Sequence, residues 1–104
     1  MKLITKAIAK KLPPIGATEN IKPEEIPVVM KLFTPDANAT WFITEGNLET
    51  GELFGLCDLG LGFPELGYVD LNELKTIRGR FGLPVERDRY YTGTLAKAKE
   101  SVGL

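Results

Sequence analysis

The chain has 104 residues, a formal net charge of −1, and contents of 43% hydrophobic and 26% charged residues. These are ordinary values for a globular protein, and they exclude the disordered and fibrous classes. The length predicts one domain over residues 1–104, large enough to bury a hydrophobic core without metal or disulfide crosslinks.

A short basic helix is predicted near the start of the chain, over residues 6–12. Thr5 is a suitable N-cap, and the two prolines that follow residue 12 prevent the helix from continuing. Lys10 and Lys11 interrupt the apolar stretch that a signal peptide requires, and no apolar run is long enough to span a membrane. We therefore expect a cytoplasmic protein that does not insert into a membrane.

Three strands are predicted after a proline-rich wrapping loop at residues 13–27. They are rich in β-branched and aromatic residues, which suit a half-buried pleated surface, and they cover residues 28–33, 40–44 and 53–57. Pro35, Asp36 and Asn38 are typical turn residues between the first two strands. Because the connections are too short for a crossover, the three strands should form an antiparallel meander.

The clearest local signal lies in the third quarter of the chain. Asp70 followed three residues later by Glu73 indicates a capping box, and Leu71, Leu74 and Ile77 then line one face of the helix that it opens. Glycines and a proline after residue 78 end this helix. The remaining predicted elements are a strand at residues 66–69, an edge strand at 85–91 and a terminal helix at 94–102.

These elements predict an α+β fold. We expect an antiparallel sheet of about four to five strands with two to three short helices packed on one face. Trp41 is expected in the core, with a ligand platform as the alternative. The predicted core consists of Leu32, Phe42, Leu56, Leu71, Leu74 and Ile77.

Several kinds of chemistry are missing from the sequence. The chain has no histidine, which removes Ser–His and Cys–His activation and the commonest ligands of zinc and copper. The single Cys57 cannot form an intramolecular disulfide, as is typical of a reducing compartment. Gly60 and Gly62 lack the spacing of a dinucleotide fingerprint. We therefore expect no cofactor and no metal.

The charges are unevenly distributed along the chain. Residues 1–22 carry a net charge of +4, residues 23–75 carry −8, and residues 76–104 carry +3. The basic ends can form a patch if the termini meet, or they can pair with the acidic middle. The basic groups concerned are Lys2, Lys6, Lys10, Lys11, Arg78, Arg80, Arg87 and Arg89.

The densest polar stretch, residues 86–91, is the main candidate binding site. In a strand, its acidic residues and Tyr90 share one face, while its arginines and Tyr91 share the other. The basic aromatic face suits an anionic ligand, whereas the alternative is an edge strand protected by charge against aggregation. The other candidate binding residues also have structural alternatives. Asp36 and Glu45 can be turn residues, and Arg78 can complement the C-terminus of the predicted helix. The candidate binding residues are Arg78, Glu86, Arg87, Asp88, Arg89, Tyr91, Asp36 and Glu45.

An ordered series of motifs between about residue 3 and residue 91 resembles a bacterial family catalogued as domain of unknown function 2958. The motifs are Lys11-Leu12-Pro13-Pro14, Phe33-Thr34-Pro35-Asp36, Trp41-Phe42-Ile43-Thr44-Glu45, Phe54-Gly55-Leu56, Glu65-Leu66-Gly67-Tyr68, Asn72-Glu73-Leu74, Arg78-Gly79 and Gly82-Leu83-Pro84-Val85-Glu86-Arg87-Asp88. The resemblance carries no activity, cofactor or catalytic residue. It implies a gene carried by plasmids, phages and integrative elements, and hence an accessory role beside their other genes.

Two functions are therefore expected. The first is a non-catalytic interaction module that binds a protein partner of a mobile genetic element. The alternative is a small enzyme or nucleic-acid-binding protein that acts on an anionic substrate through Glu86, Arg87 and Asp88, with Asp36 or Glu45. Nucleic acid is the less favoured partner because the acidic middle of the chain repels phosphate at long range.

Overall fold

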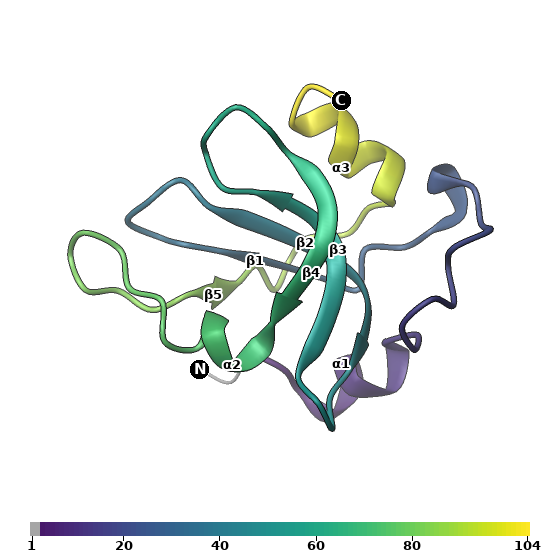
Figure 1. The fold of residues 1–104 in the computed structure, drawn as a ribbon, viewed down its shortest axis with the longest axis horizontal. Helices are drawn as coiled ribbons and strands as arrows, with labels where there is room; N and C mark the ends of the chain where they lie inside the picture. The colour runs from purple at the N-terminus through teal and green to yellow at the C-terminus, as the bar shows by residue number, and fades with distance from the viewer. Residues whose placement is uncertain (1–2) are drawn as a thin grey trace.

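Five antiparallel strands form a single sheet at the centre of the protein (Figure 1). The computed structural model describes residues 3–104. The strand order is β4-β3-β2-β1-β5, so the first four strands form a meander and β5 pairs with β1. The strands are β1 (Met30–Phe33), β2 (Thr40–Asn47), β3 (Glu52–Asp58), β4 (Glu65–Asp70) and β5 (Glu86–Arg87). The predicted antiparallel α+β fold is confirmed.

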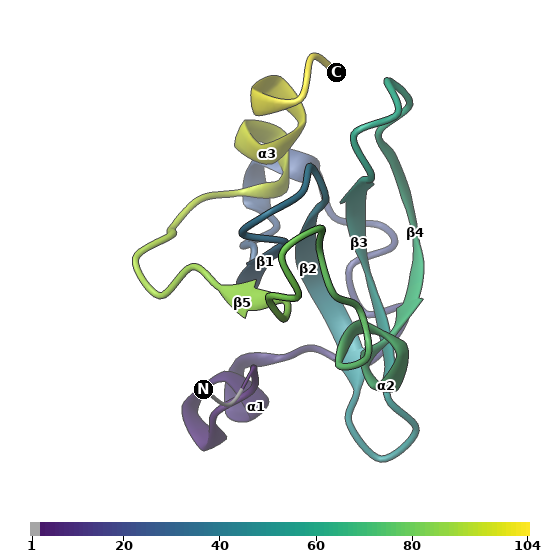
Figure 2. The ribbon, with the colours of Figure 1, turned by 90° about the vertical axis from the view of Figure 1, so that its left-hand side faces the viewer.

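Helices cover both faces of the sheet, and the expectation that they share one face is wrong. In both views α3 lies above the sheet, while α1 and α2 lie below it (Figures 1 and 2). The helices are α1 (Lys6–Lys11), the 3-10 helix η1 (Pro23–Glu25), α2 (Leu71–Leu74) and α3 (Leu95–Ser101). Within residues 3–104, no helix is both long enough and apolar enough to cross a bilayer.

The two covered faces give two hydrophobic clusters. Trp41 and Phe42 are neighbours on β2, so their side chains enter opposite clusters. The cluster below the sheet contains Leu3, Met30, Leu32, Trp41, Ile43, Leu53, Leu71, Leu74 and Val85, and the cluster beneath α3 contains Ile26, Val28, Phe42, Leu56, Leu95 and Ala98. Five of the six predicted core residues are buried, whereas Ile77 is only partly buried, because it follows α2 at the margin of the lower cluster.

A β-bulge in β2 changes the direction of the side chains that follow it. Ile43 pairs with Gly55, but Glu45 pairs with Phe54, so Thr44 is the extra residue. Glu45 therefore faces the α3 side of the sheet, together with Phe54. At the bulge β2 and β3 approach each other closely, and a Cβ atom on Gly55 would lie 2.0 Å from the carbonyl oxygen of Phe42.

The predicted helix starts are confirmed by their capping hydrogen bonds. Thr5 Oγ1 accepts a hydrogen bond from the amide of Ile8 at 3.2 Å, and Asp70 Oδ1 accepts one from the amide of Asn72 at 2.8 Å. The Glu73 side chain does not return a bond to the Asp70 amide, because Asp70 still belongs to β4. The α2 helix is a single turn, shorter than its apolar pattern predicts.

The last strand is also shorter than the sequence predicts. The amide of Asp88 still donates to the carbonyl of Lys31 at 2.9 Å, but the chain then leaves the sheet. Asp88 Oδ1 accepts a hydrogen bond from the amide of Tyr90 at 3.0 Å, which closes a turn. The strand predicted over residues 85–91 is therefore reduced to the two residues of β5.

Replacing Asp70 with alanine should lower the free energy of unfolding by about 0.5–2 kcal/mol, because the substitution removes the α2 cap. Urea denaturation of the variant and the wild type measures this difference. Asp70→Asn keeps an acceptor oxygen and should retain most of the stability. Equal losses for the two variants would contradict a capping role.

Candidate functional site

The segment 86–91 does not form the two-faced recognition strand that its sequence pattern predicts. Arg87 pairs with Leu32 and donates from Nη1 to the carbonyl of Leu3 at 2.5 Å, on the lower side of the sheet. Tyr91 packs against Phe42 on the α3 side, with 5.7 Å between ring centroids. The alternation fails because the turn at Asp88 reverses the chain between the two residues.

Tyr91 belongs to a small packed group on the α3 side. The Lys31 ammonium lies 5.1 Å from the centroid of the Tyr91 ring and 5.6 Å from that of Phe42. Burial, and secondarily the charge of Asp88, raises the pKa of the Tyr91 hydroxyl. Glu86 pairs with Phe33, and Arg89 is exposed. This segment thus closes the β1 edge of the sheet, and Tyr91 packs against the protein while Tyr90 is exposed.

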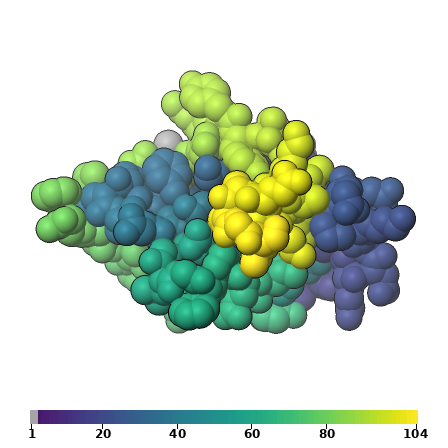
Figure 3. Space-filling model, turned by 90° about the horizontal axis from the view of Figure 1, so that it is seen from above, coloured from purple at the N-terminus to yellow at the C-terminus, as the bar shows by residue number. Residues whose placement is uncertain are grey.

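Asp36 holds a distant loop in place. Its Oδ2 accepts hydrogen bonds from the amides of Phe81 at 2.7 Å and Leu83 at 3.2 Å. A Cβ atom on Gly79 would lie 1.6 Å from Asp36 Oδ1, so only glycine fits beside the carboxylate. The β1–β2 turn also touches the β3–β4 loop, because Gly60 lies against Asn38. The three loops lie side by side at one end of the sheet (Figure 3).

Arg78 is engaged at the end of α2. Its Nη1 donates to the carbonyls of Lys75 and Ile77, each at 2.9 Å. Lys75 is the C-cap of α2 and Ile77 follows it by two residues, so Arg78 bonds the end of α2 and the turn after it, which is the position of a residue that complements the helix C-terminus.

Glu45 is a buried carboxylate that fixes the loop after α1. Its Oε1 accepts a hydrogen bond from the amide of Gly16 at 2.6 Å, and its Oε2 accepts bonds from the amide of Thr18 at 2.9 Å and from the Thr18 hydroxyl. Burial raises the pKa of Glu45, but the hydrogen bonds outweigh it and leave the pKa below its ordinary value of 4.5. Glu45 therefore holds its charge to fasten the loop, and it is not a turn residue.

Glu45→Gln should cost about 1.5–3 kcal/mol of stability at neutral pH, because an amide cannot accept all three bonds. A depressed folded-state pKa contributes stability above the unfolded pKa, and this contribution is lost as the pH falls through the folded value. The difference between wild type and variant should therefore shrink as the pH drops below about 4.5. Urea denaturation across this pH range measures it, with Glu19→Gln on the exposed part of the same loop as the control. A difference that stays constant with pH would contradict the assignment.

The predicted candidates do not converge on one site. Asp88 lines a hollow beside the β1–β2 turn, Glu86 lines another beside Leu3, and Glu45 lines a third beside Thr18. Among residues 3–104, no group of three or more histidine, cysteine, aspartate or glutamate side chains is placed to hold a metal ion.

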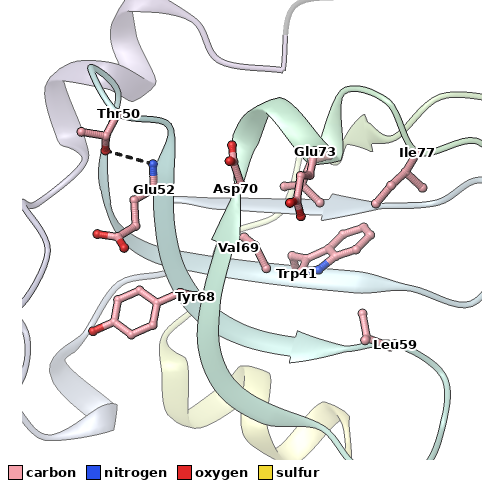
Figure 4. Close-up of a pocket in the computed structure, with 10 residues that line it drawn as sticks. Trp41, Thr50, Glu52, Leu59, Tyr68, Val69, Asp70, Glu73 and Ile77 are labelled. Atoms are coloured by element: carbon pink, nitrogen blue, oxygen red, sulfur yellow. Dashed lines mark hydrogen bonds between the residues drawn. The ribbon is translucent and has the colours of Figure 1, made fainter.

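A larger hollow of about 700 Å³ lies along β4 (Figure 4). We call it the β4 groove. One set of its side chains, which includes Val69 and Ile77, lies on the same side of β4 as Trp41, and Tyr68 and Glu52 lie on the other side. The residues that line the groove are Trp41, Thr50, Glu52, Leu59, Tyr68, Val69, Asp70, Glu73, Leu74 and Ile77.

The β4 groove has an apolar part and an acidic end. Leu59 and Ile77 are apolar and lie where the β3–β4 loop meets the groove, away from the start of α2. Glu52 pairs with Asp70 at the end of β4, and Glu73 follows on α2, so three carboxylates line this end of the groove, with Glu52 and Glu73 on opposite sides of β4 (Figure 4). Among residues 3–104, no lysine or arginine lines the groove. Its chemistry therefore suits a ligand that is part apolar and part cationic.

The strand beside the groove has a free edge. β4 is the end strand of the sheet, and within residues 3–104 no strand pairs with its outer side. The six residues of β4 include no lysine and no proline, which are the usual protection of an exposed edge. The opposite edge strand, β5, has only two residues and continues into a charged turn. The two edges differ, and β4 is the open one.

Sequence reasoning missed the β4 groove. Trp41 is buried in the core, as the sequence predicts, with 3% of its surface exposed, and it also lines the groove. The available signal was Leu66 to Val69, an apolar strand without protecting residues, next to the acidic positions 65, 70 and 73. The sequence does not show which strand lies at the edge of the sheet.

One family model, described as a protein of unknown function (DUF2958), matches residues 3–99. This match covers nearly the whole chain and agrees with the motifs that the sequence presents. No curated protein and no solved structure matches the chain.

Proposed function

The chain belongs to the DUF2958 family of proteins of unknown function, and we propose that it is a non-catalytic interaction module that binds a protein partner through the β4 groove. We place it in the bacterial cytoplasm, as an accessory protein of a mobile genetic element. The observation that carries the proposal is an open strand edge beside a hollow with an apolar part and an acidic end. Exposed apolar surface of this kind is typical of protein-binding sites.

The alternative function, an enzyme acting on an anionic substrate, has less support. Catalysis requires groups that meet around a reacting atom, and Glu86, Asp88 and Glu45 line separate hollows. Arg87 and Arg78 both donate to backbone carbonyls. These contacts favour structural roles for the two arginine side chains.

The proposal is tested by capture of the native partner from the host cell. The double variant Leu59→Arg with Tyr68→Arg fills the groove, and its two sites are 54% and 62% exposed, so the fold should tolerate it. Tyr90→Arg with Leu104→Arg makes the same charge change at exposed sites outside the groove. A partner held by the wild type and the control, and lost by the groove variant, is expected. Equal capture by both variants would place the docking surface elsewhere.

Nonspecific binding to nucleic acid should be weak or absent. The net charge is −1, and the β4 groove carries carboxylates that repel phosphate. Of the basic groups at the two ends, Lys2 lies outside the described residues, and Arg78 and Arg87 are bonded to backbone carbonyls. Titration of labelled duplex and single-stranded DNA at low and moderate salt measures the affinity. Micromolar or tighter binding at about 150 mM salt would contradict a protein partner.

A further inference from the structure

We propose that the partner contributes an extended segment of about six residues that pairs with β4 as a sixth strand. The segment carries apolar side chains at one end and lysine or arginine at the other. This inference rests on the proposed function, since it identifies the chemistry of the partner at the same groove. It follows from the free backbone edge, the shape of the groove and the distribution of its charge.

The backbone of β4 supplies the first requirement. A strand at the edge of a sheet presents a row of amide and carbonyl groups to its outer side, and an added strand satisfies them. β4 has six residues, Glu65–Asp70, which corresponds to about 20 Å of extended chain. This length accommodates a segment of similar size.

The groove takes in both sides of β4, as an added strand requires. Successive side chains of a strand point to opposite faces of the sheet. If a segment were added next to β4, one set of its alternating side chains would enter the space near Trp41 and Val69. The other set would lie near Tyr68 and Glu52 (Figure 4). A hollow confined to one face would suit a small ligand, whereas this one follows the strand.

The charge of the groove determines the composition of the segment. Glu52, Asp70 and Glu73 lie at the α2 end of β4, and within the described part of the chain no lysine or arginine lines the groove. At the opposite end the β3–β4 loop presents Leu61 and Phe63, which are 73% and 83% exposed. A segment with basic residues at one end and apolar residues at the other therefore complements both ends.

A second copy of this chain is a poorer occupant of the same edge. If two β4 strands paired in the antiparallel direction about a twofold axis, Glu65 of one copy would face Asp70 of the other. Like charges opposite each other on adjacent strands destabilise the pairing. The charge pattern thus favours a basic partner.

The fluorescence of Trp41 reports directly on the groove, because it is the chain's single tryptophan. The probes are capped synthetic peptides of about eight residues, with valine and leucine at one end and lysines at the other, tested in both sequence directions. In a second pair, glutamate replaces every lysine. A saturable change in Trp41 fluorescence with a lysine peptide, which weakens as salt is raised, is expected. No binding of either lysine peptide, or equal binding of the glutamate peptides, would overturn the inference.

Charge reversal on the protein tests the acidic end. Glu52→Lys with Glu73→Lys should weaken binding of the lysine peptide by about tenfold or more, because attraction at two positions becomes repulsion. Asp70 is left unchanged because it caps α2. Glu24→Lys with Glu25→Lys makes the same charge change in η1, outside the groove, and should change the affinity by less than about twofold. Equal losses for the two double variants would overturn the assignment of the basic end to this site.

Backbone methylation of the peptide tests the pairing itself. In an added strand, alternate amides of the peptide donate to β4 and the others face away. N-methylation of one alternate set should abolish binding, and methylation of the other set should leave it. Equal effects of the two sets would overturn strand addition. If the peptides fail while the native partner is still lost from the Leu59→Arg, Tyr68→Arg variant, the inference falls and the proposed function stands.

Discussion

Gly55→Ala is expected to lower the free energy of unfolding by about 3 kcal/mol, through overpacking at the β2 bulge. The added Cβ would lie 2.0 Å from the carbonyl oxygen of Phe42 and 2.9 Å from the Cα of Ile43. Both atoms belong to the backbone of the central strand, so no rotation of a side chain relieves the contact. The midpoint of thermal unfolding should fall by roughly 10–20 °C.

The matched control for this substitution is Gly67→Ala. Gly67 is the partner of Gly55 on β4, and nothing lies within 4 Å of the position that its Cβ would occupy. The same change of residue in the same pair of strands should therefore alter stability by about 0.5 kcal/mol or less. Thermal and urea denaturation of both variants give the comparison. Similar losses at positions 55 and 67 would mean that the bulge register between β2 and β3 is wrong.

Leu74→Ala should cost about 2–5 kcal/mol, because it removes a buried side chain and leaves a cavity. Leu74 is 2% exposed and packs in the lower cluster. The single turn of α2 has few other contacts to hold it against the sheet, and Leu71 is its only other buried residue. Urea denaturation measures the loss from a lower midpoint with an unchanged slope.

Leu61→Ala provides the comparison for Leu74. Leu61 is 73% exposed on the β3–β4 loop, so the same substitution there removes little buried surface. Its effect should stay within about 0.5 kcal/mol. A loss of less than about 1 kcal/mol for Leu74→Ala would mean that the register of α2 against the sheet is wrong.

The strand predicted over residues 85–91 shows one way in which a sequence pattern can predict the wrong local structure. Residues 86–91 are dense in charge, and a strand over all six would display them on two faces. The carboxylate of Asp88 instead bonds the Tyr90 amide and ends the strand. The turn at Asp88 therefore replaces the predicted strand, and residue type alone does not show whether such a segment forms a strand or a turn.

Glu45 shows a second kind of failure. In a regular strand it would point to the same side as Ile43, and the extra residue Thr44 turns it to the other side. There it meets the amides of Gly16 and Thr18, nearly thirty residues away in the sequence. A bulge has no strong signature in a single sequence, so neither the burial of Glu45 nor its role in fastening the loop was predictable.

The sequence by itself determined the class of fold, the meander of the first three strands and the starts of the helices. These depend on short-range rules: a cap lies within three residues of the amide that it serves, and a short loop forces its two strands to be antiparallel. The tertiary structure alone decided which strand lies at the open edge and which acidic residues line the groove beside it. Edges and grooves depend on how distant strands are ordered, and Glu52 comes to line one groove with Asp70 and Glu73 only when β3 pairs with β4.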